Sequence, residues 1–233
     1  MSLKNNSHGI LLVNKPLNKS SFYLVYLLRK LTGIQKIGHA GTLDPLATGV
    51  MVMLIGKTYT TKSDFFLNDD KEYEVTVQLG ASTTTYDLEG DVVNQSQLDA
   101  DQTPTLKQVE EALTHFQGEC EQTPPMFSAK KLDGKRLYEL ARKGVEVERK
   151  AQKVTLHTHL VRYNYPELTL FVRCSKGTYI RSIAHDLGIQ LGCFGHVKTL
   201  TRVRSGRFKI DECLDIETLT SPEFCYENHL QQL

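Results

Sequence analysis

Residues 38–49 read Gly38-His39-Ala40-Gly41-Thr42-Leu43-Asp44-Pro45-Leu46-Ala47-Thr48-Gly49. Three glycines and a proline within twelve residues are incompatible with a regular helix or a central strand, because glycine loosens the backbone and proline lacks an N–H donor. We therefore predict a shaped loop. It carries one carboxylate, Asp44, and its only other ionisable side chain is His39.

The residues that follow this loop, 50–55, form an uninterrupted apolar run. Such a run is typical of a strand buried on both faces, so we expect the loop to hold Asp44 at the edge of a core. An isolated Asp-Pro pair is most often an Asx turn, in which the carboxylate bonds to nearby backbone. The residues alone therefore leave a structural and a catalytic interpretation of Asp44 open.

Outward from the loop, the pattern predicts an α/β protein. We expect a first buried strand at residues 10–13 and then a helix that begins at Ser20 or Ser21 and ends at Gly33. Residues 71–79 alternate as in a half-buried strand. A helix is expected after a cap at Thr103, a short one at residues 137–141, a hairpin at 154–174, and a helix from about residue 180.

The composition is that of a globular protein with a substantial core: 233 residues, of which 40% are hydrophobic. The longest apolar runs are about six residues, too short for a membrane span, and residues 1–6 show no signal-peptide pattern, so we expect a cytoplasmic protein. The five cysteines are odd in number and no two lie closer than twelve residues. This spacing indicates neither a disulfide framework nor a metal site.

The net charge of +1 conceals a strong asymmetry. Residues 130–209 contain 18 Lys and Arg against 6 Asp and Glu, whereas the rest of the chain contains 10 against 21. A segregated basic segment favours a polyanionic partner, although such segments are also found as ordinary solvated surface. Charge alone leaves nucleic-acid binding open.

Residues 38–49 resemble the catalytic motif of the TruB family of tRNA pseudouridine synthases. Further stretches resemble motifs of this family in the same order: residues 71–73, 83–90, 124–144, 174–183 and 196–207. The resemblance covers residues 9–210. It implies the pseudouridine synthase fold, an α/β (α+β) arrangement with a mixed, largely antiparallel central sheet flanked by helices and loops, and with RNA-binding insertions.

The resemblance also implies roles for individual residues. Asp44 would be the catalytic aspartate, Arg181 the arginine that pairs with it, and Tyr73 the tyrosine that lies over the target uracil. His39 would fill the space left by the flipped uridine. Residues expected to contact RNA are Lys15, Lys130, Lys131, Lys176, Leu200 and Arg202, with a structural role left open for Lys15. Asn18 stands where the family usually has glycine, and Thr84 where an acidic residue is common.

The implied substrate is the T arm of tRNA, whose T-loop uridine at position 55 would become pseudouridine. This isomerisation needs no cofactor and no metal, and the resemblance implies none. We expect one catalytic domain over residues 1–233, with a short acidic tail and without the C-terminal PUA domain of most bacterial members. We also expect a monomer with no membrane association and no obligate protein partner.

Two other functions remain compatible with the sequence. A pure RNA-binding module would use the same basic segment but would not need Asp44 for turnover. A glycosidase would need a second catalytic carboxylate within about 5 to 10 Å of the first. Asp87 is the obvious candidate for that second carboxylate, but its turn motif already explains it.

Overall fold

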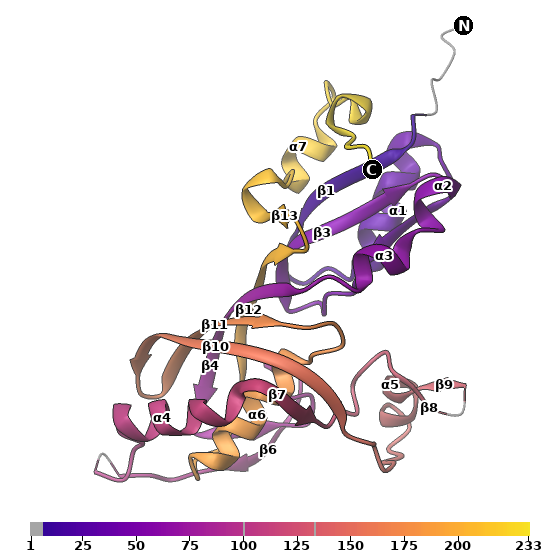
Figure 1. Cartoon of the computed structure of the whole chain (residues 1–233). Coiled ribbons are helices and arrows are strands. Elements are labelled where there is room, and N and C mark those ends of the chain that lie inside the picture. The colour runs from indigo at the N-terminus through magenta and orange to yellow at the C-terminus, as the bar shows by residue number, and fades with distance from the viewer. Residues whose placement is uncertain (1–6, 100, 133) are drawn as a thin grey trace, which may run out of the picture. The chain divides into compact units, whose positions relative to one another are not determined.

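The computed structural model describes residues 7–99, 101–132 and 134–233, and the chain divides into two compact units (Figure 1). The first unit consists of the described residues up to Tyr73 together with Thr201–Leu233. The second unit is Glu74–Leu200. The fold is mixed α/β with a large, mostly antiparallel sheet, as the sequence predicts, and strands β4 and β12 contribute residues to both units.

The first unit is built on strand β3 (Ala47–Ile55). It pairs in antiparallel fashion with β1 (Gly9–Lys15) and with the short β2 (Ile37–Ala40). Its remaining elements are α1 (Ser21–Thr32), α2 (Lys57–Thr60), α3 (Ser63–Leu67), β13 (Phe208–Lys209), η2 (Ile210–Glu212), α7 (Ile216–Thr220) and η3 (Tyr226–His229). Apolar side chains from β1 and β3 pack with Phe66 and Phe208 in one core cluster.

Helix α1 has the ends that its sequence predicts. The Ser20 hydroxyl accepts a hydrogen bond from the Tyr23 N–H at 3.2 Å, which makes Ser20 the N-cap. Gly33 ends the helix with a φ of 74°, a left-handed conformation that glycine adopts without strain. Ser21, the other candidate cap, is buried and does not cap the helix.

The expected acidic tail is an ordered part of the first unit. Leu214 exchanges backbone hydrogen bonds with β1, donating to Leu12 and accepting from Asn14. Gln231 does the same with Ile10. Leu219 is buried, so the segment adds apolar burial as well as hydrogen bonds.

In the second unit the strand order is β12 (Gly195–Ser205), β4 (Lys71–Leu79), β11 (Glu167–Cys174), β10 (Gln152–Asn164) and β7 (Gln117–Gln122). Helix α4 (Leu106–Leu113) contacts both strand β10 and helix α6 (Ile180–Gln190) (Figure 1). The smaller elements are β5 (Ala81–Thr83), β6 (Val92–Gln95), η1 (Thr114–Phe116), β8 (Lys131–Leu132), β9 (Lys135–Arg136) and α5 (Leu137–Ala141).

One helix start differs from the prediction. Thr105, not Thr103, caps α4, because its hydroxyl accepts from the Gln108 N–H while the Gln108 side chain accepts from the Thr105 N–H.

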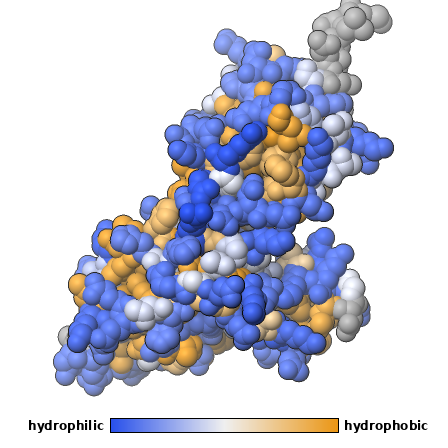
Figure 2. All heavy atoms as spheres, viewed as in Figure 1, coloured by the Kyte–Doolittle hydropathy of each residue, from blue (hydrophilic) through white to orange (hydrophobic). Residues whose placement is uncertain are grey.

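The surface that Figure 2 shows is mainly hydrophilic on both units, with apolar residues in smaller patches. Within the described ranges, no helix combines the length and the apolar character that crossing a membrane requires.

Candidate active site

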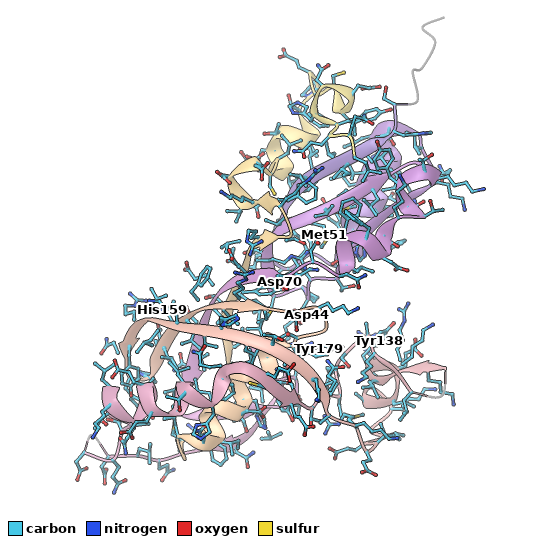
Figure 3. The ribbon with its side chains drawn as sticks, viewed as in Figure 1. Asp44, Met51, Asp70, Tyr138, His159 and Tyr179 are labelled. Carbon is cyan, nitrogen blue, oxygen red and sulfur yellow. The ribbon has the colours of Figure 1, made fainter. Side chains whose placement is uncertain are left out.

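Asp44 lies in the loop between β2 and β3 of the first unit (Figure 3), and the backbone on both sides of it is fixed. The Ser21 hydroxyl donates to the Leu43 carbonyl and accepts from the Leu43 N–H, both at 2.9 Å. The Ala47 N–H donates to the Asp44 carbonyl at 3.0 Å. The position of this carboxylate is therefore set by helix α1 and by the loop's own turn.

Lys15 supports the same loop from β1. Its buried Nζ donates to the carbonyls of Pro16, Lys19 and Pro45, the last at 3.2 Å. A buried ammonium needs such partners, and these carbonyls place Lys15 in a structural role. Lys15 is completely buried in this structure, and its contact with an RNA phosphate stays a prediction.

Asn18 reaches the same loop through its backbone. Its N–H donates to the Pro45 carbonyl at 2.9 Å, and its φ is 60°. Asparagine tolerates this left-handed conformation better than other non-glycine residues. The turn is therefore formed here without the glycine that the family usually has at this position.

Arg202 on β12 is a second buried cation beneath the loop. Its Nε donates to the Val50 carbonyl at 2.8 Å and one of its terminal nitrogens to the Gly41 carbonyl at 3.2 Å. Gly49 lies so close that a Cβ there would be 2.2 Å from the Arg202 carbonyl oxygen, so only glycine fits. Arg202 is only 1% exposed and donates to backbone carbonyls in this structure, and its contact with RNA stays a prediction. Leu200 is likewise buried, and its contact with RNA stays a prediction.

His39 lies half-buried on β2, the strand that leads into the loop. Its Nδ1 is buried and has no hydrogen-bond partner among the described residues. Burial and the nearby Arg202 charge both lower the pKa of His39 below its ordinary 6.5. The imidazole is therefore neutral at pH 7.

Tyr73 lies on β4, where the predicted alternation of buried and exposed residues is confirmed. The buried residues of this strand include Tyr73, Val75, Val77 and Leu79. Two neighbours fix its start: the Lys71 Nζ donates to the carbonyls of Phe66, Leu67 and Asp69, and Glu72 pairs with Arg204 at 2.6 Å.

Arg181 lies in the first turn of α6 in the second unit, as predicted, and is buried. Its two terminal nitrogens donate to the carbonyls of Thr85 at 2.8 Å and Phe127 at 2.7 Å. The Asp87 carboxylate lies 3.5 Å from the first of these nitrogens. Three contacts thus hold the guanidinium in one orientation.

The start of α6 is itself tied to β7. Gln122 bonds twice to the backbone of Tyr179, which is labelled in Figure 3, and the Ser182 hydroxyl donates to the Thr123 carbonyl at 2.9 Å. These bonds supply partners for the first turn of a helix whose N-cap, Tyr179, makes no side-chain capping bond. The helix therefore carries Arg181 on a fixed backbone.

The ion pair between Arg181 and Asp87 is a contact that sequence reasoning missed. Asp87 was explained by its turn, and the structure does show turn bonds from the Glu89 N–H and the Thr85 hydroxyl. The carboxylate is, however, only 1% exposed, and a carboxylate buried so deeply needs a cation. The only sequence feature that pointed to a cation for Asp87 was the arginine of the motif at residues 174–183.

The three remaining candidate lysines lie near the surface of the second unit. Lys131 on β8 and Lys176 are exposed, and Lys130 is half-buried with its Nζ 2.9 Å from the Gln152 side-chain oxygen. The candidate residues are thus divided between the units: Lys15, His39, Asp44, Tyr73 and Arg202 in the first, and Lys130, Lys131, Lys176, Arg181 and Leu200 in the second. The pairing of Asp44 with Arg181 stays a prediction.

No group of three or more His, Cys, Asp or Glu side chains arranged to hold a metal ion occurs in residues 7–99, 101–132 and 134–233. Two buried imidazole nitrogens, Nδ1 of His39 and Nδ1 of His185 in α6, have no hydrogen-bond partner among the described residues. His185 stacks on Tyr86 with 3.8 Å between ring centroids. Neither ring belongs to a metal-ligand cluster of the described chain.

Comparison with solved structures supports the fold. The chain is similar to a chain in "Crystal Structure of a Cbf5-Nop10-Gar1 Complex", with a TM-score of 0.70 and 23% identity over 96% of this chain. It spans 57% of that solved chain. A similar match, with a TM-score of 0.66, is to "Structure of H/ACA RNP bound to a substrate RNA containing 2'-deoxyuridine".

Comparison with sequences is more specific. The TruB family pseudouridylate synthase N-terminal domain matches residues 29–180, and the tRNA pseudouridylate synthase B C-terminal domain matches residues 181–233. The chain is 58% identical to tRNA pseudouridine synthase B of Protochlamydia amoebophila, over 92% of this chain and 82% of that one. It is 54% identical to the Chlamydia pneumoniae protein of the same name, over 96% and 93%. The chain therefore belongs to the TruB family of pseudouridylate synthases.

Proposed function

We propose that this chain converts the T-loop uridine at position 55 of tRNA to pseudouridine. It is an isomerase of the tRNA pseudouridine synthase B type, as its relatives over nearly the whole chain are. One structural observation supports the proposal most directly: Asp44 is carried on a loop that Ser21, Lys15 and Arg202 hold rigidly. A fixed carboxylate at the edge of a core is what this chemistry needs.

The reaction breaks the bond between N1 of uracil and C1′ of ribose and forms a bond between C5 and C1′. The proton lost from C5 and the proton gained at N1 balance, so no oxidant, cofactor or energy source is required. Asp44 would act either as the nucleophile or as a base in a route through a glycal. A closed site would retain the detached uracil while it turns.

Arg181 is proposed to keep Asp44 ionised and aimed through paired hydrogen bonds, a geometry that lysine cannot reproduce. The contacts of Arg181 with Thr85, Phe127 and Asp87 support this role, because a guanidinium fixed in advance loses little entropy when it orients a partner. Arg181 is thus a positioning residue in this scheme.

The target uridine lies in a folded RNA loop and must be flipped out before it can react. We propose that Tyr73 stacks on the flipped base and that His39 fills the vacated space. Stacking on an aromatic side chain contributes about 1 to 3 kcal/mol per base. The lowered pKa of His39 supports its part, since a neutral imidazole enters a base stack at a smaller desolvation cost than a charged one.

Lys130, Lys131 and Lys176 are proposed to bind phosphates of the T arm. Their position near the surface supports this role, and such contacts fix register without reading sequence. Contacts of Lys15, Leu200 and Arg202 with RNA are implied by the family resemblance alone. In this proposal, both units act as one catalytic domain, which works as a monomer on tRNA in the cytoplasm.

The glycosidase alternative is disfavoured by the surroundings of Asp87. A general acid must reach its substrate, but this carboxylate is buried, pairs with Arg181 and accepts two turn hydrogen bonds. An RNA-binding module without catalytic activity differs from the proposed enzyme only in that it forms no pseudouridine.

The proposal is tested with an unmodified tRNA transcript and purified protein. Pseudouridine is mapped after incubation, and a matched transcript with cytidine at position 55 serves as the control. We expect one pseudouridine per tRNA, in the T loop, and none in the control. Tight tRNA binding without any pseudouridine would instead support the binding module.

A further inference from the structure

The first unit contains a basic region that the 130–209 segment does not include. Residues 1–43 contain six Lys and Arg, namely Lys4, Lys15, Lys19, Arg29, Lys30 and Lys36, and no Asp or Glu. Lys15 is used inside the protein, as described above. Arg29 and Lys36 instead line a pocket.

This pocket has a volume of about 440 Å³ and is lined by Arg29, Gln35, Lys36, Ile37, Gly38 and Thr60. The lining residues come from the last turn of α1, the segment leading into β2, and the end of α2 (Figure 1). The lining therefore includes two cations, an amide and a hydroxyl, but no carboxylate. Such a set of donors suits an anion.

Arg29 is incompletely paired in this pocket. Its Nε is buried and has no hydrogen-bond partner among the described residues. One terminal nitrogen reaches the Ile37 carbonyl at 3.5 Å, the outer limit of a hydrogen bond. A buried donor without a partner carries a free-energy cost, so the protein alone does not satisfy all the hydrogen-bond donors of Arg29.

Exposed aromatic rings lie on the same helix. Phe22 is 60% exposed, and the Arg29 guanidinium lies 5.8 Å from the centroid of its ring. Tyr26, one turn further along α1, is 63% exposed. A donor-lined pocket beside exposed rings is the combination by which proteins bind single-stranded nucleic acid, whose phosphates meet cations and whose bases stack.

We infer that the pocket between α1, β2 and α2 binds a backbone phosphate of the substrate RNA, with Arg29 and Lys36 as its ligands. This inference rests on the proposed function, because the RNA is taken to be the tRNA substrate. It adds a contact to the first unit, whereas the lysines proposed to bind the T arm all lie in the second unit.

Lys36→Gln is the main test, with Arg29→Gln as a second variant. Lys30→Gln is the matched control, because Lys30 is an exposed cation in the same turn of α1 that does not line the pocket. The Kd for tRNA is measured by filter binding between 50 and 200 mM KCl, alongside kcat and KM. Lys36→Gln should weaken binding by about 5-fold, reduce the slope of log Kd against log salt by about 0.7 to 0.9, and raise KM without changing kcat.

Several results would overturn the inference. If the pocket holds RNA, Lys36→Gln weakens binding and Lys30→Gln does not, so equal Kd values and equal salt slopes for the two variants contradict the inference. A second contradiction would be that inorganic phosphate raises the Tm of wild type but not of Lys36→Gln while both bind tRNA alike, since the pocket would then hold a free anion. The Kd measurement does not depend on catalysis. A failure of the proposed isomerase activity would therefore be seen separately, as the absence of pseudouridine.

Discussion

Arg181 is a buried cation that contacts, among its partners, two backbone carbonyls and one carboxylate. Each of these contacts uses the planar, forked shape of the guanidinium, which the single ammonium of lysine cannot match. Asp87 in turn depends on Arg181, because removing one partner of a buried ion pair costs about 3 to 5 kcal/mol. The residue thus has a structural task in the second unit beside the positioning task that we propose for it.

Arg181→Lys should lower the single-turnover rate constant far more than the affinity for tRNA. The positive charge is kept, but the geometry that aims Asp44 is lost. The measurement is single-turnover pseudouridine formation at saturating protein, with circular dichroism to establish the folded fraction. An unchanged rate constant with weaker binding would show that Arg181 is a phosphate contact instead.

His39 makes a prediction about pH. Its pKa is below 6.5 in the folded protein, because burial and Arg202 disfavour the charged imidazole. As pH falls below 6.5, the unfolded state takes up this proton first, so stability decreases until the pH reaches the folded pKa. From pH 7.5 to 5, the Tm of wild type should therefore fall more than that of His39→Gln. Parallel Tm curves for the two proteins would contradict this assignment.

At the scale of elements, α1 and the catalytic loop are joined through one side chain. Ser21 bonds to both the N–H and the carbonyl of Leu43, whereas its neighbour Ser20 only caps the helix. Of the two adjacent serines, Ser21 therefore supports the catalytic loop and Ser20 stabilises the start of the helix.

Ser21→Ala should destabilise the protein by about 1 to 3 kcal/mol, because it leaves two buried backbone groups of Leu43 without their partner. It should also lower kcat, since Asp44 follows Leu43 directly. Ser20→Ala, the matched control, should cost about 1 kcal/mol through loss of the cap but leave kcat unchanged. Urea denaturation and steady-state kinetics measure both effects. Equal kcat values for the two variants would show that the loop does not depend on Ser21.

Local sequence patterns predicted most of the elements. The caps of α1, the strand after the catalytic loop, the alternation along β4 and the β10–β11 hairpin all follow from signals within a few residues. Even the cap of α4 was misplaced by only two residues, since Thr103-Pro104 and Thr105 are both plausible starts. Whether a segment forms a helix or a strand was predictable here from residues within that segment and at its ends.

Burial of charged residues could not be predicted in this way. Arg202 is satisfied by carbonyls at residues 41 and 50, and Arg181 by Thr85, Asp87 and Phe127, all of which are distant in sequence. A lysine or arginine in a list of residues looks the same whether it faces water or a carbonyl inside the protein. For this reason the sequence did not predict that backbone carbonyls accept from Lys15 and Arg202, or that Asp87 pairs with Arg181.

At the scale of the whole molecule, the same effect changes the meaning of the charge asymmetry. The basic segment 130–209 includes Arg181 and Arg202, which are buried and support the fold. Residues 1–43 belong to the part of the chain that is acidic as a whole, although they contain the pocket cations Arg29 and Lys36. Burial has to be known before a count of charges describes a binding surface.

An isolated T stem-loop should be modified almost as efficiently as whole tRNA, because the contacts proposed for Lys130, Lys131 and Lys176 all serve the T arm. Lys130→Glu combined with Lys131→Glu should raise KM on both RNAs by a similar factor, and binding should weaken steeply with salt. The measurement is kcat/KM for both RNAs at two salt concentrations. A loss of more than about 100-fold on the stem-loop, equivalent to roughly 2.7 kcal/mol, would show that further contacts with the tRNA body are essential.

The most direct test of the account compares wild type with Asp44→Asn on an unmodified tRNA transcript. Asparagine keeps the size of the side chain and the bonds of the loop backbone, but it lacks the carboxylate that the chemistry needs. Both proteins should bind tRNA with similar Kd and unfold at a similar Tm, while only wild type forms pseudouridine at position 55. Formation of pseudouridine by Asp44→Asn at a rate near that of wild type, with contaminating enzyme excluded, would contradict the role of Asp44.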